Sequence, residues 1–181
     1  MTTPSALHSK KTFKWGTPRW VIQISKILLD NQIHLDPASS PEFNQLVQAL
    51  VFYTEQDNGL IQEWGGNVFL NPPGGLVNEF WQKLVTNIRS GQVEKAIWVG
   101  FSVEQLCTLA DFTEYPLDYS TVILRKRLTS NTEDLTIGSS PSHGNYITGL
   151  NVDKDLFKKL FDRFGRVIHG VLALRNSKNQ V

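Results

Sequence analysis

An asparagine followed by two prolines stands directly after the apolar run Val68-Phe69-Leu70. Residues that precede a proline are pushed to an extended backbone, so Asn71 and Pro72 are both held extended. Because prolines donate no backbone hydrogen bond, the Asn71 side-chain carbonyl and the Pro72 carbonyl are two neighbouring acceptors at a predicted strand end. Two fixed acceptors can hold both hydrogens of an amine and turn its lone pair toward an electrophile. The motif therefore makes Asn71, Pro72 and Pro73 candidate catalytic residues for amine methylation. The alternative is that the three residues form a loop that only ends a strand.

Acidic residues follow two other predicted strands. Residues 33–35 form a short strand that ends at Asp36, and the continuous apolar run 49–53, typical of a strand buried on both faces, precedes Glu55 and Asp57. Doubly wound proteins bind nucleotides where the carboxyl ends of strands gather, and an acidic residue about twenty positions after the first loop commonly binds the ribose. The pattern predicts a site for a nucleotide-like ligand, although each acid alone is also typical of a solvated turn.

Helical periodicity predicts the elements that carry these loops. Apolar residues over 20–29 have helical spacing, with Thr17 as the expected N-cap and Pro18 at the first helical position. This alternation of helices and strands predicts an α/β, Rossmann-like three-layer fold with a mostly parallel central sheet. Further helices are expected at residues 42–48, 76–88 (closed by Gly91) and 153–164, and further strands at 95–101, 121–124, 146–150 and 167–174.

Composition limits the organisation and the partners. The chain has 181 residues, 40% of them apolar, which suits a single domain over residues 15–181 after a flexible basic tail at residues 1–14. A formal charge of +1 gives no global basic field, so any contact with nucleic acid must come from a local patch. The best candidate for a local basic surface combines the tail lysines, Arg19 and the run 125–127. The alternative is that these cations are only an ordinary solvated tail and strand end.

Other residue types point away from disulfide, metal and membrane chemistry. The single Cys107 excludes an internal disulfide and a thiolate cluster, and it lies in a helical-looking segment where a buried structural thiol is expected. His143 has no second ligand at metal-binding spacing, so a loop hydrogen bond or phosphate contact is expected of it. The sequence shows no membrane span and no signal-peptide core, which predicts a cytoplasmic protein.

Several short motifs occur in a fixed order along most of the chain. The motifs are Trp15-x-Thr17-Pro18, Leu35-Asp36-Pro37-Ala38-Ser39, Tyr53-Thr54, Asn58-Gly59-Leu60, Trp64-x-Gly66-x-Val68-Phe69 and Asn71-Pro72-Pro73. In this order they resemble the phage-type (Dam-like) DNA N6-adenine methyltransferase family, and the similarity continues more loosely through Trp81-Gln82-Lys83 and residues 125–150.

The resemblance implies a methyltransferase fold that binds S-adenosylmethionine and methylates a flipped adenine in double-stranded DNA. Thr17 and Pro18 would lie near the methionine end of the cofactor, Asp36 beside it, and Glu55 or Asp57 near its ribose or adenine. The full implied cofactor set is Trp15, Thr17, Pro18, Asp36, Pro37, Glu55, Asp57 and Asn71, and the implied substrate set is Gly74, Trp64, Tyr146, His143, Arg125 and Arg127.

One position departs from the family pattern. Family members carry an aromatic residue directly after the two prolines, whose ring stacks on the flipped base, whereas this chain has Gly74. Stacking contributes about 1–3 kcal/mol per base, so an active enzyme needs another ring, for which Trp64 and Tyr146 are the candidates. The alternatives are a catalytically silent relative that binds nucleic acid or cofactor, and a methyltransferase for another planar amine. The small size leaves room for a homodimer or a recognition partner.

Overall fold

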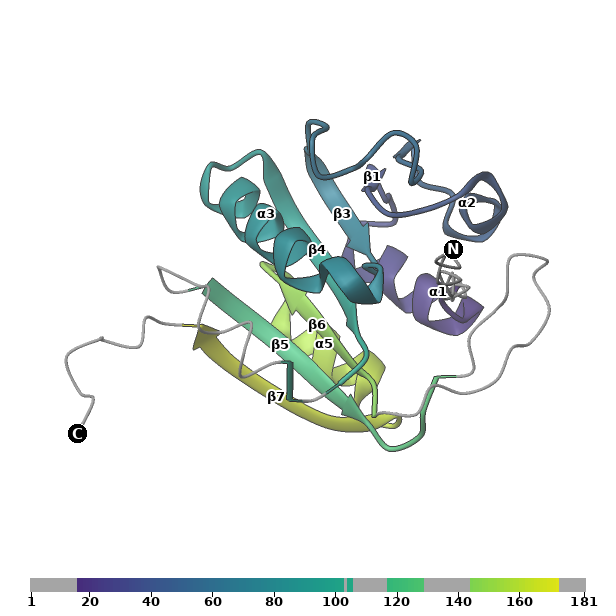
Figure 1. Ribbon diagram of the computed structural model, residues 1–181. Coiled ribbons are helices and arrows are strands. Elements are labelled where there is room, and N and C mark those ends of the chain that lie inside the picture. The colour runs from purple at the N-terminus through teal and green to yellow at the C-terminus, as the bar shows by residue number, and fades with distance from the viewer. Residues whose placement is uncertain (1–15, 103, 106–116, 129–143, 173–181) are drawn as a thin grey trace, which may run out of the picture.

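The computed structural model of the protein describes residues 16–102, 104–105, 117–128 and 144–172, which form one seven-stranded sheet with helices on both faces (Figure 1). The helices are α1 (Arg19–Leu28), α2 (Pro41–Val47), α3 (Val77–Arg89) and α5 (Lys154–Phe161), with a 3-10 turn η1 (Gly74–Leu76). The strands are β1 (Leu35–Asp36), β2 (Val51–Phe52), β3 (Gly66–Leu70), β4 (Val93–Gly100), β5 (Leu117–Leu124), β6 (Tyr146–Leu150) and β7 (Gly165–Leu172).

The sheet is mixed, with the strand order β2-β1-β3-β4-β6-β5-β7. Strands β2, β1, β3 and β4 are parallel to one another. Strand β6 pairs antiparallel with β4 and β5, and β5 pairs antiparallel with β7, and these antiparallel pairs contribute most of the paired residues. The expectation of a mostly parallel sheet was therefore wrong. Apolar runs identify buried strands, but they carry no information on strand direction, and the direction changes at β4.

The three-layer arrangement predicted from the sequence is confirmed. On one face α3 covers the parallel half of the sheet, and its Trp81 ring meets Trp98 of β4 edge to face at 5.1 Å between ring centroids. On the other face α1 and α5 share a core in which Phe157 and Phe161 are fully buried. Because both faces are covered, the middle strands are buried on both sides, as expected for the apolar run over β4.

Strand β2 differs from its prediction. It forms the edge of the sheet and holds only two paired residues, and Leu50 and Val51 are 68% and 47% exposed. The continuous apolar run was interpreted as a strand buried on both faces, which is wrong because Val51 is exposed in this two-residue edge strand.

Three of the helix ends show how the loops around the sheet are fixed. The Ser40 hydroxyl accepts a hydrogen bond from the backbone N–H of Phe43 at 3.3 Å and caps α2, and Gly91 follows α3 with a φ of +77°. The predicted N-cap of α1 was wrong: Pro18 occupies that position, with no side-chain cap. The hydroxyl of Thr17 has a different partner, described below.

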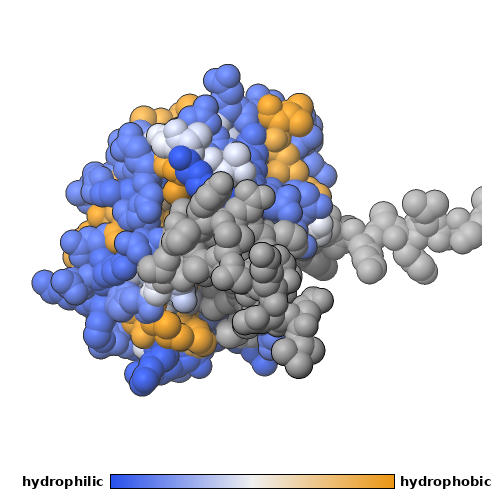
Figure 2. Space-filling model, turned by 90° about the vertical axis from the view of Figure 1, so that its left-hand side faces the viewer, coloured by the Kyte–Doolittle hydropathy of each residue, from blue (hydrophilic) through white to orange (hydrophobic). Residues whose placement is uncertain are grey.

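The surface next to α3 is mostly hydrophilic, with hydrophobic residues in separate groups among the atoms that are coloured in Figure 2. None of the helices in the described ranges has the length and apolar character needed to cross a membrane. The basic tail, Trp15, Cys107 and His143 lie outside the described residues.

Candidate active site

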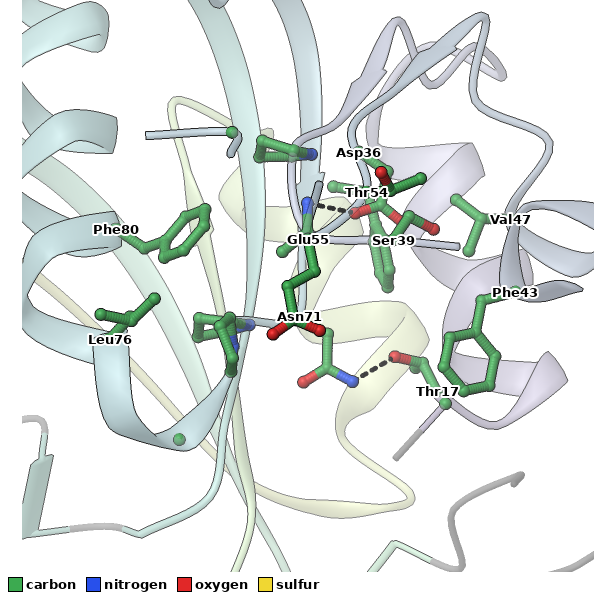
Figure 3. Close-up of a pocket in the computed structure, with 18 of the residues that line it drawn as sticks. Thr17, Asp36, Ser39, Phe43, Val47, Thr54, Glu55, Asn71, Leu76 and Phe80 are labelled. Carbon is green, nitrogen blue, oxygen red and sulfur yellow. Dashed lines mark hydrogen bonds between the residues drawn. The ribbon is translucent and has the colours of Figure 1, made fainter. Parts of the chain in front are cut away.

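A cavity of about 380 Å³ opens at the carboxyl ends of the four parallel strands, a size within the usual range for small-molecule sites (Figure 3). The loops after β1, β2, β3 and β4 all contribute to it, so the expectation that polar residues after successive strands would gather at one edge is confirmed. The lining consists of residues 16–17, 36–39, 43, 47, 54–55, 58–59, 69, 71–76, 80 and 101.

Asn71 directly follows β3 and is held by a residue from the start of the described chain. Its Nδ2 donates a hydrogen bond to Thr17 Oγ1 at 3.1 Å. This bond orients the amide, and Figure 3 shows the Asn71 Oδ1 on the side of the cavity where Leu76 and Phe80 lie. The carbonyl oxygen thereby points toward the cavity.

The two prolines make the next part of the wall rigid. Pro72 is buried, and the Pro73 carbonyl accepts a hydrogen bond from the Leu76 backbone N–H at 3.0 Å, which closes the turn η1. Gly74 and Gly75 lie in that turn, exposed, and a Cβ atom at either position would meet no atom within 4 Å. Neither has a left-handed backbone, so a side chain at Gly74 would cause no strain.

Asp36 lies buried in the cavity, with its side chain held by the loop that follows β1. The backbone N–H of Ala38 donates to Asp36 Oδ1 at 3.3 Å, and the residue is only 3% exposed. Burial raises the pKa of Asp36 to about 6, against the opposite effects of the Ser39 side chain and the Ala38 N–H. A buried carboxyl without a cation beside it is costly when ionised, which marks the group as a candidate for binding a positively charged ligand.

The two acidic candidates after β2 have different positions. Glu55 is exposed and lines the cavity, whereas Asp57 does not line it. Asp57 Oδ2 instead accepts hydrogen bonds from the Thr54 backbone N–H at 2.8 Å and from the Thr54 hydroxyl at 2.7 Å, which lower the pKa of Asp57. Asp57 therefore shapes the loop, and of the two only Glu55 can reach a ligand in the cavity.

Gly59 brings the loop after β2 against the loop after β1. A Cβ atom there would lie 2.0 Å from the Pro37 carbonyl oxygen, so only glycine allows this approach. The Trp64 indole N–H donates to the Gly59 carbonyl at 2.8 Å and fixes the same loop from behind. Pro37 and Gly59 both line the cavity, and this packing closes its wall.

The structure does not bring the two proposed stacking rings into the cavity. Trp64 is buried against Phe80, at 5.9 Å between ring centroids, and supports the wall from outside. Tyr146 is fully buried beneath Gly100, and its hydroxyl accepts a hydrogen bond from the Trp98 indole at 3.2 Å. Burial raises the pKa of Tyr146. Both rings are core residues, and neither lines the cavity.

Other rings line the cavity in their place. The four are Phe43 of α2, Phe69 of β3, Phe80 of α3 and Phe101 after β4. Sequence reasoning missed them, although Phe101 is the last residue of the strand predicted at 95–101 and could have been found by the same strand-end rule that selected Asn71. Phe80 lies on the apolar stripe of its helix and carries no distinguishing signal.

The remaining candidates lie away from the cavity lining. Pro18 begins α1 beside the cavity without lining it. Arg125 and Arg127 are exposed and follow β5, at the edge of the sheet where β4 ends. Within the described ranges, no three His, Cys, Asp or Glu side chains gather as a metal site.

Comparison with known proteins places the site in a family. The sequence model of the DNA N-6-adenine-methyltransferase (Dam) family matches residues 4–99 of the 181, and this range contains Thr17, Asp36, Glu55 and Asn71. No curated protein matches the sequence. Because the match covers more than half of the chain, this protein belongs to the Dam family and is a DNA N6-adenine methyltransferase, whose family implies S-adenosylmethionine as methyl donor and DNA as substrate.

Proposed function

We propose that the cavity holds S-adenosylmethionine and the target adenine on opposite sides of Asn71, with the adenine flipped out of double-stranded DNA. The observation that carries this proposal is the hydrogen bond from Asn71 Nδ2 to Thr17 Oγ1, which presents Asn71 Oδ1 to the cavity. Neither the silent relative nor a methyltransferase for another amine is favoured by any residue that lines the site.

The side of the cavity nearest to β1 and α2 fits the cofactor. It combines the buried carboxyl of Asp36 with the Ser39 side chain and the apolar side chains of Phe43 and Val47, and the exposed Glu55 lies at its margin. S-adenosylmethionine supplies a methyl group on a sulfonium and also carries an ammonium group, a ribose and an adenine. Asp36 would bind a cationic group of the cofactor, and Glu55 would accept hydrogen bonds from the ribose hydroxyls. The apolar side chains would pack against the adenine ring.

The side nearest to η1 and α3 fits a planar base. Leu76 and Phe80 lie on this side of Asn71 (Figure 3), and Phe80 is buried while Leu76 is 41% exposed. Asn71 Oδ1 and the Pro72 carbonyl would accept the two hydrogens of the adenine amine. Holding both hydrogens takes the nitrogen lone pair out of conjugation with the ring and makes it nucleophilic. The proton that leaves after methylation can pass to water, so the site needs no strong base.

A transfer assay tests this proposal directly. The protein is incubated with S-adenosylmethionine carrying a labelled methyl group and with duplex DNA, RNA or protein. The label is expected in DNA, as N6-methyladenine after digestion to nucleosides. Label on another nucleoside, or only in RNA or protein, would contradict the proposed base side of the cavity.

Asp36 gives a prediction that combines stability and binding. Its pKa is raised to about 6 in the folded protein, so the unfolded chain loses this proton at lower pH than the folded one. The free energy of unfolding should therefore fall as pH rises through about 4 to 6, and the ionised carboxyl should cost about 3 kcal/mol above that range. Asp36→Asn should accordingly be more stable than wild type near neutral pH, with little difference below about pH 4.

The same variant should bind S-adenosylmethionine more weakly, because the buried negative charge is lost. Urea denaturation at two pH values measures the stability, and isothermal calorimetry measures the binding. The matched control is Asp155→Asn, since Asp155 is exposed on α5 and does not line the cavity. Equal cofactor affinity in wild type and Asp36→Asn would remove Asp36 from the binding site.

A further inference from the structure

The carboxyl edge of the sheet carries a group of exposed cations beside the cavity. The group comes from three separate segments, namely the start of α1, the residues after β5, and the connection from α5 into β7. We call it the arginine edge, and it consists of Arg19, Arg125, Lys126, Arg127, Arg163 and Arg166. We propose that the arginine edge binds the phosphate backbone of the duplex whose adenine enters the cavity, an inference that rests on the proposed function.

Strand pairing places two of these segments together. Leu124 at the end of β5 pairs with Gly165 at the start of β7, and the backbone N–H of Arg125 donates to the Phe164 carbonyl at 3.0 Å (Figure 1). Arg125 and Arg166 are both close enough to Asp162 to lower the pKa of that carboxyl. The residues after β5 and those between α5 and β7 thus form one surface.

An aromatic stack joins the start of α1 to this surface. The Trp20 ring lies on the Phe164 ring, with 4.2 Å between centroids and an angle of 18° between the planes. The Arg163 guanidinium lies over the same Phe164 ring at 4.6 Å from its centroid. Arg19 precedes Trp20 and follows the cavity segment that contains Thr17, so the arginine edge reaches the cavity along the chain.

A hydrogen-bonded connection links the other end of the surface to the cavity. The Leu128 backbone N–H donates to Asn145 Oδ1 at 2.9 Å, and Asn145 Nδ2 donates to the Gly100 carbonyl at 3.3 Å. Gly100 ends β4 and is followed by Phe101, which lines the cavity. The run 125–127 is therefore held at a fixed position relative to the cavity.

The charge of the surface suits a polyanion. Among the described residues, Asp162 adjoins the arginine edge and forms a salt bridge with Lys158 at 2.8 Å, and the exposed Glu104 follows β4 at the same edge of the sheet. None of the six cations forms a salt bridge with another described residue. Arginine presents several donors in a planar fork that matches phosphate oxygens, and duplex DNA places about one charge per 1.7 Å of its axis along such a surface.

The test compares a double variant with a matched control in the full chain. Arg125→Gln with Arg166→Gln removes two charges from the arginine edge, and Lys95→Gln with Lys154→Gln removes two from the opposite edge, where β4 and α5 begin. Fluorescence anisotropy with a labelled duplex over a range of KCl concentrations gives the dissociation constant and its salt dependence. Steady-state kinetics with the same duplex gives kcat and KM, and calorimetry gives cofactor affinity.

The arginine-edge variant should bind duplex DNA about tenfold or more weakly, with a salt slope reduced by roughly one unit for each arginine lost. Its KM for DNA should rise while kcat and cofactor affinity stay at the wild-type values, and the control should match wild type. If wild type methylates DNA and the arginine-edge variant has the same KM for DNA and the same salt slope as wild type, the proposed binding of phosphates by the arginine edge is contradicted, while the proposed function of the cavity stands. If wild type binds duplex in an arginine-dependent way but transfers no methyl group, the surface is supported and the cavity proposal fails.

Discussion

Replacing Asn71 by alanine is expected to lower the rate of methyl transfer by about two to three orders of magnitude, the effect of removing one preorganised polar group from a catalytic site. The lost atom is Asn71 Oδ1, which the hydrogen bond to Thr17 presents to the cavity. Cofactor affinity and the fold should change little, because the partner left behind is a hydroxyl at the cavity surface. Single-turnover transfer with saturating cofactor and DNA measures the step, and calorimetry and thermal unfolding measure the other two quantities.

Thr17 provides the controls for this experiment. Thr17→Val removes the hydroxyl that holds the Asn71 amide but keeps the volume, so transfer should slow less than in Asn71→Ala. Thr17→Ser keeps the hydroxyl and should restore most of the rate. Transfer at nearly the wild-type rate in Asn71→Ala would mean that Asn71 only ends a strand, as the alternative interpretation of the motif holds.

Introducing a tyrosine at Gly74 should change DNA binding by up to about two orders of magnitude. No atom lies within 4 Å of the position a Cβ would take, and the backbone there is not left-handed, so the ring can be accommodated without strain. A ring that stacks on the flipped adenine adds about 1–3 kcal/mol, or roughly a five- to hundredfold tighter complex. If Phe80 or Phe101 already covers the same face of the base, the new ring should instead obstruct it and reduce activity.

Fluorescence of 2-aminopurine at the target position distinguishes these outcomes, because unstacking from the duplex brightens the probe and stacking on a new ring quenches it. Gly74→Ala is the matched control, since it removes the glycine without adding a ring. Equal signals from wild type and Gly74→Tyr, with no increase over the free duplex, would show that no base enters the cavity.

The sequence predicts which strand-end loops meet at one edge of the sheet better than it predicts the strand directions. Asp36, Glu55 and Asn71 were identified because each follows an apolar strand, and the carboxyl ends of parallel strands converge for reasons of topology that hold whatever the side chains are. The antiparallel direction of β5, β6 and β7 was not predicted, because strand direction depends on how the later connections cross the sheet. A local apolar pattern indicates that a strand is buried, and a parallel and an antiparallel strand can be equally buried.

Roles that depend on distant contacts were also not predictable. Thr17 has the type and place of a helix cap, yet its hydroxyl accepts from Asn71, a residue more than fifty positions away. Trp64 and Tyr146 are aromatic residues near family motifs, but both are held in the core by packing partners that the sequence does not reveal. Contacts between residues that are far apart in the sequence form only when the chain folds, so no local residue spacing indicates them.

The change of strand direction at β4 separates the cavity lining from most of the arginine edge. The family match ends within β4, and every residue that lines the cavity lies on the parallel side of that strand or directly after it. Most of the arginine edge lies beyond this boundary, on β5, β7 and their connections. Mutations that alter DNA affinity can therefore accumulate in the antiparallel half while Asp36 and Asn71 keep their surroundings.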